Sequence, residues 1–115
     1  MMNRKQQVKK IINKWQEKLE LSDWNLGIDL VEFKRKDYKQ SGDIKVNIKN
    51  KQATIYLSIN PFKEDELVIV HELVHQIFWE YDVFSEKLIP RDKKNLYFEK
   101  LEKTVTKVTE TLLIK

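Results

Sequence analysis

The chain has 115 residues, a net charge of +4, two histidines, two glycines and no cysteine, and this length predicts a single domain over residues 1–115. The lack of cysteine excludes disulfides, thiolate zinc sites and cysteine nucleophiles, and two isolated glycines exclude a P-loop and a dinucleotide-binding fingerprint. No segment approaches the roughly 18 apolar residues of a membrane span and the N-terminus lacks the apolar stretch of a signal peptide, so we expect a cytoplasmic protein without membrane contact.

The first predicted element is an amphipathic helix over residues 4–20. Its apolar side chains recur at helical spacing, opposite a face of lysines and glutamines: Val8, Ile11, Ile12, Trp15 and Leu19. The basic residues of this helix could attract nucleic acid. A solvated helix surface explains them more simply, so nucleic acid is disfavoured as a partner.

Three strands are predicted next. Over residues 24–33 apolar side chains alternate on both faces, which suits a strand that is partly covered on both sides. A polar loop follows at residues 34–42. Residues 44–48 and 53–59 then alternate between apolar and polar across a short polar turn at 50–51, a pattern that is typical of a hairpin. We therefore expect a mainly antiparallel three-stranded sheet.

The most informative motif lies in the apolar run over residues 67–79. His71, Glu72 and His75 form the pattern HExxH with the only two histidines of the chain. Four residues turn a helix by about 400°, so both imidazoles share one face and can bind one metal ion, while Glu72 can reach a water beside it. Without such a partner, these polar groups on a buried helix would cost several kcal/mol in desolvation. The acidic residues 64–66 suit the positive end of this helix.

After the motif, the helix is expected to end through Glu80, Tyr81 and Asp82. A loop containing Pro90 follows, and residues 93–113 repeat apolar side chains near helical spacing. The predicted order is therefore a helix, three strands, the motif helix and a last helix, which is an α+β arrangement.

The motif supplies only two of the three protein ligands that catalytic zinc normally has. Because no other histidine exists, the third ligand must be a carboxylate. The candidates are Glu80, Asp82, Asp92, Glu99, Glu102 and Glu110. Carboxylates on the last helix are better placed, since they can approach the ion from a second direction. We favour Glu102 over Glu99, because apolar residues of the last helix flank it and should turn it inward.

With these motifs the chain resembles the small gluzincin metallopeptidases, which include the minigluzincins, SprT-like proteins and phage-encoded metallopeptidases. The resemblance covers nearly the whole chain and rests on Leu21–Trp24 before the first strand, Val70–His75 on the motif helix and Glu102–Val105 on the last helix. It implies a zincin-like fold, with Zn²⁺ as the cofactor and the hydrolysis of peptide bonds as the activity.

On this hypothesis, His71, His75 and Glu102 bind Zn²⁺, which lowers the pKa of its water toward about 7. Glu72 takes the proton as the water attacks the scissile carbonyl and passes it to the leaving amine. The peptide or protein substrate could add as a strand to an edge of the sheet. The oxyanion could also bind a tyrosine, and the sequence favours none of the candidates Tyr56, Tyr81 and Tyr97.

The alternative is a non-catalytic binding module of the same fold, with a protein or nucleic-acid partner. The intact Glu72 argues against it, because a structural metal site gains nothing from a carboxylate beside its open position. A DNA-associated protease is a third reading, but the chain has neither a zinc ribbon nor an aromatic and basic platform to support it. No pattern in the chain indicates an oligomeric state.

Overall fold

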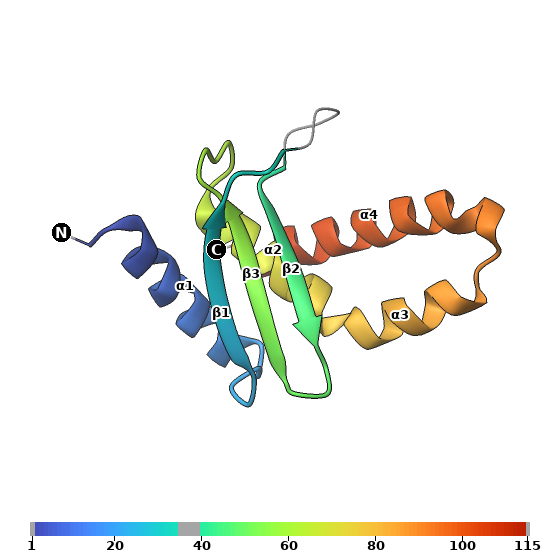
Figure 1. Ribbon diagram of the computed structural model, residues 1–115, viewed down its shortest axis with the longest axis horizontal. Coiled ribbons are helices and arrows are strands. Elements are labelled where there is room, and N and C mark those ends of the chain that lie inside the picture. Colours follow the sequence, from blue (N-terminus) through green and yellow to red (C-terminus); the bar gives the residue numbers. More distant parts are fainter. Residues whose placement is uncertain (1, 35–39, 115) are drawn as a thin grey trace.

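Figure 1 shows the computed structural model of the chain, which describes residues 2–34 and 40–114. The elements in chain order are α1 (Arg4–Lys18), β1 (Asn25–Val31), β2 (Gly42–Asn47), β3 (Gln52–Ser58), α2 (Asp65–Ile77), α3 (Trp79–Leu88), the short 3₁₀ helix η1 (Arg91–Lys93) and α4 (Lys94–Leu112). The architecture is α+β, as predicted. The expected polar loop lies mostly at residues 35–39, outside the described residues, and its last residue, Gly42, already belongs to β2.

The sheet has the strand order β1-β3-β2, so β3 lies in the middle (Figure 1). β2 and β3 pair antiparallel with Ile44 opposite Ile55, so the predicted hairpin is confirmed. β1 pairs with β3 in parallel, with Ile28 opposite the same Ile55. The prediction of a mainly antiparallel sheet is therefore wrong. Successive strands do alternate in direction, but β3 inserts between the other two and so runs parallel to β1.

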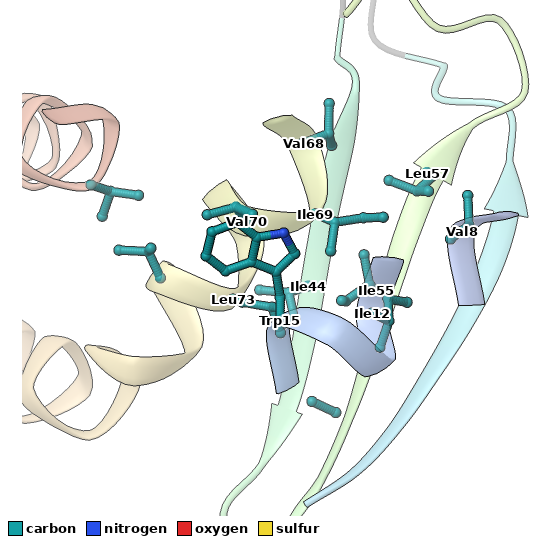
Figure 2. Close-up of a cluster of buried hydrophobic side chains, with 13 residues drawn as sticks. Val8, Ile12, Trp15, Ile44, Ile55, Leu57, Val68, Ile69, Val70 and Leu73 are labelled. Carbon is teal, nitrogen blue, oxygen red and sulfur yellow. The ribbon is translucent and has the colours of Figure 1, made fainter. Parts of the chain in front are cut away.

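The core lies where α1 and α2 pack on one face of the sheet (Figure 2). Alternate residues of the strands form the sheet side of this core, among them Ile44, Ile55 and Leu57. α1 contributes a buried stripe at helical spacing, as the sequence predicts, and Asn3 caps this helix in a capping box. The remaining buried apolar side chains are Val8, Ile12, Trp15, Ala53, Val68, Ile69, Val70, Leu73, Val74 and Val105.

The acidic first turn of α2 ties this helix to α1. Asp65 accepts a hydrogen bond from the Arg4 guanidinium at 2.8 Å, and Glu66 accepts one from the Trp15 indole at 2.7 Å. Both carboxylates also lie at the positive end of the helix, which favours negative charge. The acidic residues that the sequence places here therefore fix how the motif helix lies relative to α1.

The chain after the motif differs from the prediction. Residues 79–88 form a further helix, α3, which Phe78 alone separates from α2. α3 and the first half of α4 extend beyond the sheet as a hairpin of two helices (Figure 1). The last helix, α4, begins and ends within one residue of the predicted range. None of the helices described is long and apolar enough to cross a membrane.

Candidate metal centre

The three residues predicted as ligands lie together between α2 and α4. His71 and His75 are one turn apart on α2, and their ring centroids are 5.0 Å apart. Glu102 comes from α4, and its carboxylate contacts both rings. His71 Nε2 is 2.7 Å from Oε1 of this carboxylate, and His75 Nε2 is 3.1 Å from Oε2. Residues that lie 27 positions apart in the sequence, His75 and Glu102, therefore meet at one point.

The chemistry and spacing of this group fit a metal ion. One donor atom from each of His71, His75 and Glu102 lies within 4.8 Å of the others. Zinc binds nitrogen and oxygen at about 2.0–2.2 Å, so two ligand atoms of a tetrahedral ion are about 3.4 Å apart. Two imidazoles and one carboxylate are also a donor set found in catalytic zinc sites. The group could therefore hold a metal ion, and no fourth side chain of the described residues belongs to it.

The packing of α4 explains why Glu102 reaches the histidines. Val105 and Thr109 are buried on the side of α4 that faces the rest of the molecule. Glu102 precedes Val105 by three residues, so it lies on the same side of the helix, one turn closer to the projecting end. Its side chain is still 57% exposed, which places it at the rim rather than in the core. Glu99, the other candidate, lies a further turn along and is not part of the group.

A cleft of about 780 Å³ contains the group. α2 and α4 form two of its walls, and the start of β2 and the segment before α2 form the others. The apolar part of its lining comes from Phe62, Leu67, Val68 and Phe98. Sequence reasoning did not place Phe62 and Phe98 at the site, because neither belongs to a motif and only the fold brings them to the cleft.

Glu72, the predicted base, lines the same cleft and is only 8% exposed. Burial raises the pKa of this carboxyl to about 7, although the neighbouring His75 and His71 act in the opposite direction. Gly42 of β2 lies beside it. A Cβ atom at Gly42 would lie 3.4 Å from Glu72 Oε2 and 2.4 Å from Val68 Cγ1. The absence of a side chain at this position therefore lets β2 approach α2 next to Glu72.

Hydrogen bonds from His71 and His75 hold the pKa of the Glu102 carboxyl well below its usual range. The pKa of His75 responds in the opposite sense. Burial lowers it, but the hydrogen bond with Glu102 and the negative charges of Glu72 and Glu102 together raise it above its ordinary value. The carboxylate at the centre of the group is therefore in its charged form, which is the form that binds metal ions.

The other predicted candidates are not in the group. Of the carboxylates, Glu99 and Glu110 line the cleft, whereas Glu80 and Asp82 are on α3 and Asp92 is in η1. None of the three candidate tyrosines lines the cleft. Tyr81 projects from α3, and the Tyr97 hydroxyl donates to Asp82 at 2.6 Å. Tyr56 lies in the central strand. A tyrosine among these three is therefore not placed to bind an oxyanion.

No protein family and no curated protein matches the chain. The residues of the site offer a binding group for one divalent ion and, within the same cleft, a sheltered carboxylate that is not part of that group. Such a pair can support a hydrolytic reaction, in which water must be both polarised and deprotonated.

Proposed function

We propose that the protein is a zinc-dependent metallopeptidase with a zincin-like fold. His71, His75 and Glu102 hold the ion, and Glu72 is the general base. The observation that carries this proposal is the position of Glu102, whose carboxylate lies at hydrogen-bonding distance from both histidines of the motif. A coincidental HExxH sequence has no reason to meet a carboxylate from a distant helix. The resemblance of the motifs to the small gluzincins supports the same class.

Zinc in this group would act as a Lewis acid on the substrate carbonyl and lower the pKa of water. Glu72 would perform the proton transfers. Its carboxylate accepts the proton of the attacking water and returns it to the nitrogen of the leaving amine. The burial of Glu72 suits this role, because a carboxylate with little hydration is more readily protonated during a reaction.

The edge of the sheet offers a place for the substrate. Over the described residues β2 pairs only with β3, so its other edge is open. The first residues of β2, Gly42 and Asp43, line the cleft that contains the metal group. An extended peptide that pairs with β2 would therefore pass the metal group, and the apolar side chains of Phe62 and Phe98 would be available to its side chains.

Elemental analysis of protein purified without chelators tests the metal. We expect about one zinc per chain, and loss of this zinc in His71→Ala and His75→Ala. Two histidines and one carboxylate also form the facial triad of non-haem iron oxygenases, so iron in place of zinc would contradict the assignment. No bound metal, with none taken up on titration at neutral pH, would overturn the proposal as a whole.

Cleavage of a peptide library by the zinc-loaded protein tests the activity. Glu72→Gln keeps the shape of the side chain but removes the base, so we expect it to retain zinc and to lose about 10²- to 10⁴-fold in turnover. Undiminished cleavage in this variant would contradict the role of Glu72. A protein that binds zinc and cleaves nothing would instead be the non-catalytic binding module.

A further inference from the structure

Helix α3 turns three large apolar side chains toward solvent. Tyr81, Phe84 and Leu88 are 67%, 63% and 69% exposed. Apart from Ile114 near the C-terminus, they are the most exposed large apolar side chains of the described residues. Their spacing of three and then four residues places them along one side of the helix, within an arc of about 60°. We call these three residues the α3 stripe.

On its other side, α3 packs Trp79 against the core and directs polar groups toward α4. Asp82 accepts a hydrogen bond from the Tyr97 hydroxyl at 2.6 Å, and the Glu86 carbonyl accepts one from Lys94 Nζ at 3.2 Å. No residue of α3 is buried. Apart from Trp79, α3 thus differs from an ordinary surface helix, which buries its apolar face and exposes its polar face. The fold of the chain does not use the α3 stripe, and such a stripe marks an interaction surface.

We propose that the α3 stripe is a dimer interface on which α3 of a second copy packs antiparallel. Tyr81, Phe84 and Leu88 follow the a, d, a spacing of a coiled-coil seam. Glu80 and Lys87 are one heptad apart and flank the seam on the same side. In an antiparallel pair, residues at this flank face their counterparts, so Glu80 of each copy meets Lys87 of the other.

The same register also matches the apolar side chains. With the two-fold axis between residues 82 and 83, Tyr81 of each copy packs against Phe84 of the other, and Leu88 lies opposite Ile77, the exposed last residue of α2. Both ion pairs form in this register. A parallel pair would instead place Glu80 opposite Ser85 of the other copy, without a charged partner, and Lys87 opposite position 92, which lies in η1 beyond the end of α3. The charge pattern therefore fits a second copy in the antiparallel direction, and this complementarity is the argument for a dimer.

The position of α3 leaves room for this contact. The hairpin of α3 and α4 projects beyond the sheet, so a second copy can approach α3 without displacing another element (Figure 1). None of the α3 stripe residues lines the metal cleft. The dimer would thus leave the cleft open, and this inference does not depend on the proposed function.

Sedimentation velocity of the full chain over a range of concentrations tests the interface. We expect a concentration-dependent dimer whose dissociation constant rises roughly 100-fold in Phe84→Glu, because a charge then replaces an apolar side chain at the seam. Far-ultraviolet circular dichroism should be unchanged, since Phe84 makes no buried contact. Ile59→Glu is the matched control, because Ile59 is 47% exposed but lies outside α3, and it should leave the dimer intact.

Exchange of the flanking charges tests the direction of the helices. Glu80→Lys and Lys87→Glu should each weaken self-association, because each places like charges opposite one another. An equimolar mixture of the two variants should dimerise again, since the introduced lysine of one chain would then face the introduced glutamate of the other. Variants that associate as the wild type does, or a mixture that does not recover, would overturn the antiparallel register.

A wild-type chain that remains a monomer at every concentration would overturn the dimer itself. Flotation with phosphatidylcholine–phosphatidylserine vesicles then tests the remaining alternative, in which the α3 stripe binds a lipid surface. Binding that Phe84→Glu abolishes and Ile59→Glu preserves would assign the α3 stripe to a lipid surface instead of a second copy.

Discussion

Helices α2 and α3 follow one another with a single residue between them, yet their environments are opposite. α2 lies against the sheet with most of its residues buried, including Leu73 and Glu72. α3 has no buried residue and is held to α4 through polar contacts. The comparison shows that the site spans two regions of different packing. The two histidines are on the buried helix, and Glu102 belongs to the projecting hairpin.

Local stability should follow this division. Segments with few buried apolar contacts open at a lower free-energy cost than the core does. The hairpin should therefore open more readily than α2. In that case the histidines form the fixed part of the site and Glu102 the part that can move away.

Truncation in the two helices should have very different costs. Leu73→Ala removes a fully buried side chain and should lower the free energy of unfolding by about 2–5 kcal/mol. Phe84→Ala, on the exposed face of α3, should change it by no more than about 0.5 kcal/mol. Urea unfolding at low protein concentration, followed by tryptophan fluorescence, measures both. Similar losses of stability in the two variants would contradict the difference in packing between α2 and α3.

Removal of Glu102, the proposed ligand on the hairpin, should affect metal binding much more than folding. Glu102→Ala should raise the zinc dissociation constant by roughly 100-fold or more. Loss of a residue that only hydrogen-bonds to a ligand already lowers metal affinity by about 10- to 100-fold. Unfolding of the metal-free variant should change little, because the side chain is 57% exposed.

Competition with a chromogenic chelator measures this affinity, with Glu99→Ala as the control. Glu99 lines the cleft one turn away from Glu102 but is not in the metal group. Its variant should bind zinc as the wild type does. A larger loss in Glu99→Ala than in Glu102→Ala would move the ligand by one helical turn.

The two glycines of the chain form a matched pair. A Cβ atom at Gly42 would meet Val68 Cγ1 at 2.4 Å, so Gly42→Ala must displace the Val68 side chain or push β2 away from α2, and it should cost about 1–3 kcal/mol in stability. At Gly27 the nearest atom, Thr54 Oγ1, is 3.7 Å away, which is an ordinary contact. Gly27→Ala should therefore be neutral within about 0.5 kcal/mol.

The two glycine variants should also differ in turnover, because only Gly42 lies beside Glu72. Because Gly42 lies beside Glu72, Gly42→Ala should also reduce turnover of the zinc-loaded protein, while zinc content stays the same. Gly27→Ala should leave turnover unchanged. Equal stability and turnover in the two alanine variants would show that the close approach of β2 to α2 is not needed.

The contact between the two helices of the hairpin should respond to alkaline pH. Burial, the hydrogen bond to Asp82 and the charge of Asp82 raise the pKa of Tyr97 to about 12. The folded state thus keeps a proton that the unfolded state loses near pH 10, so stability should fall as pH rises from about 10 to 12. Absorbance titration at 295 nm, compared with Tyr97→Phe, should show the late-titrating tyrosine. Its absence would mean that the Asp82 contact does not form.

Much of this fold could be predicted, because local patterns determine it. The spacing of apolar residues in α1, the alternation in β2 and β3, and the acidic start of α2 all act within a few residues. The parallel pairing of β1 with β3 could not be predicted. It depends on which strand occupies the middle of the sheet, and alternation of side chains does not encode this order.

α3 was missed for a related reason. Helix prediction from the sequence assumes that apolar residues face the core, whereas Tyr81, Phe84 and Leu88 of α3 face solvent. For the metal group, the fixed geometry of a helix brings the histidines together. The choice between Glu99 and Glu102 depends on how α4 is rotated against α2. The buried Val105 sets this rotation, and the apolar neighbours of Glu102 did point to it. The approach of Gly42 to Glu72 left no signal in the sequence beyond the rarity of glycine.

The position of Glu102 also has a consequence for chain entropy. An ion bound by His75 and Glu102 would close a loop of 27 residues that contains all of α3 and the start of α4. As a crosslink, it would resemble a disulfide, for which a loop of this length corresponds to about 3–4 kcal/mol in the chain-entropy model. In a chain without cysteine, zinc would then serve as a reversible crosslink. Zinc removal would release the helical hairpin before the sheet unfolds.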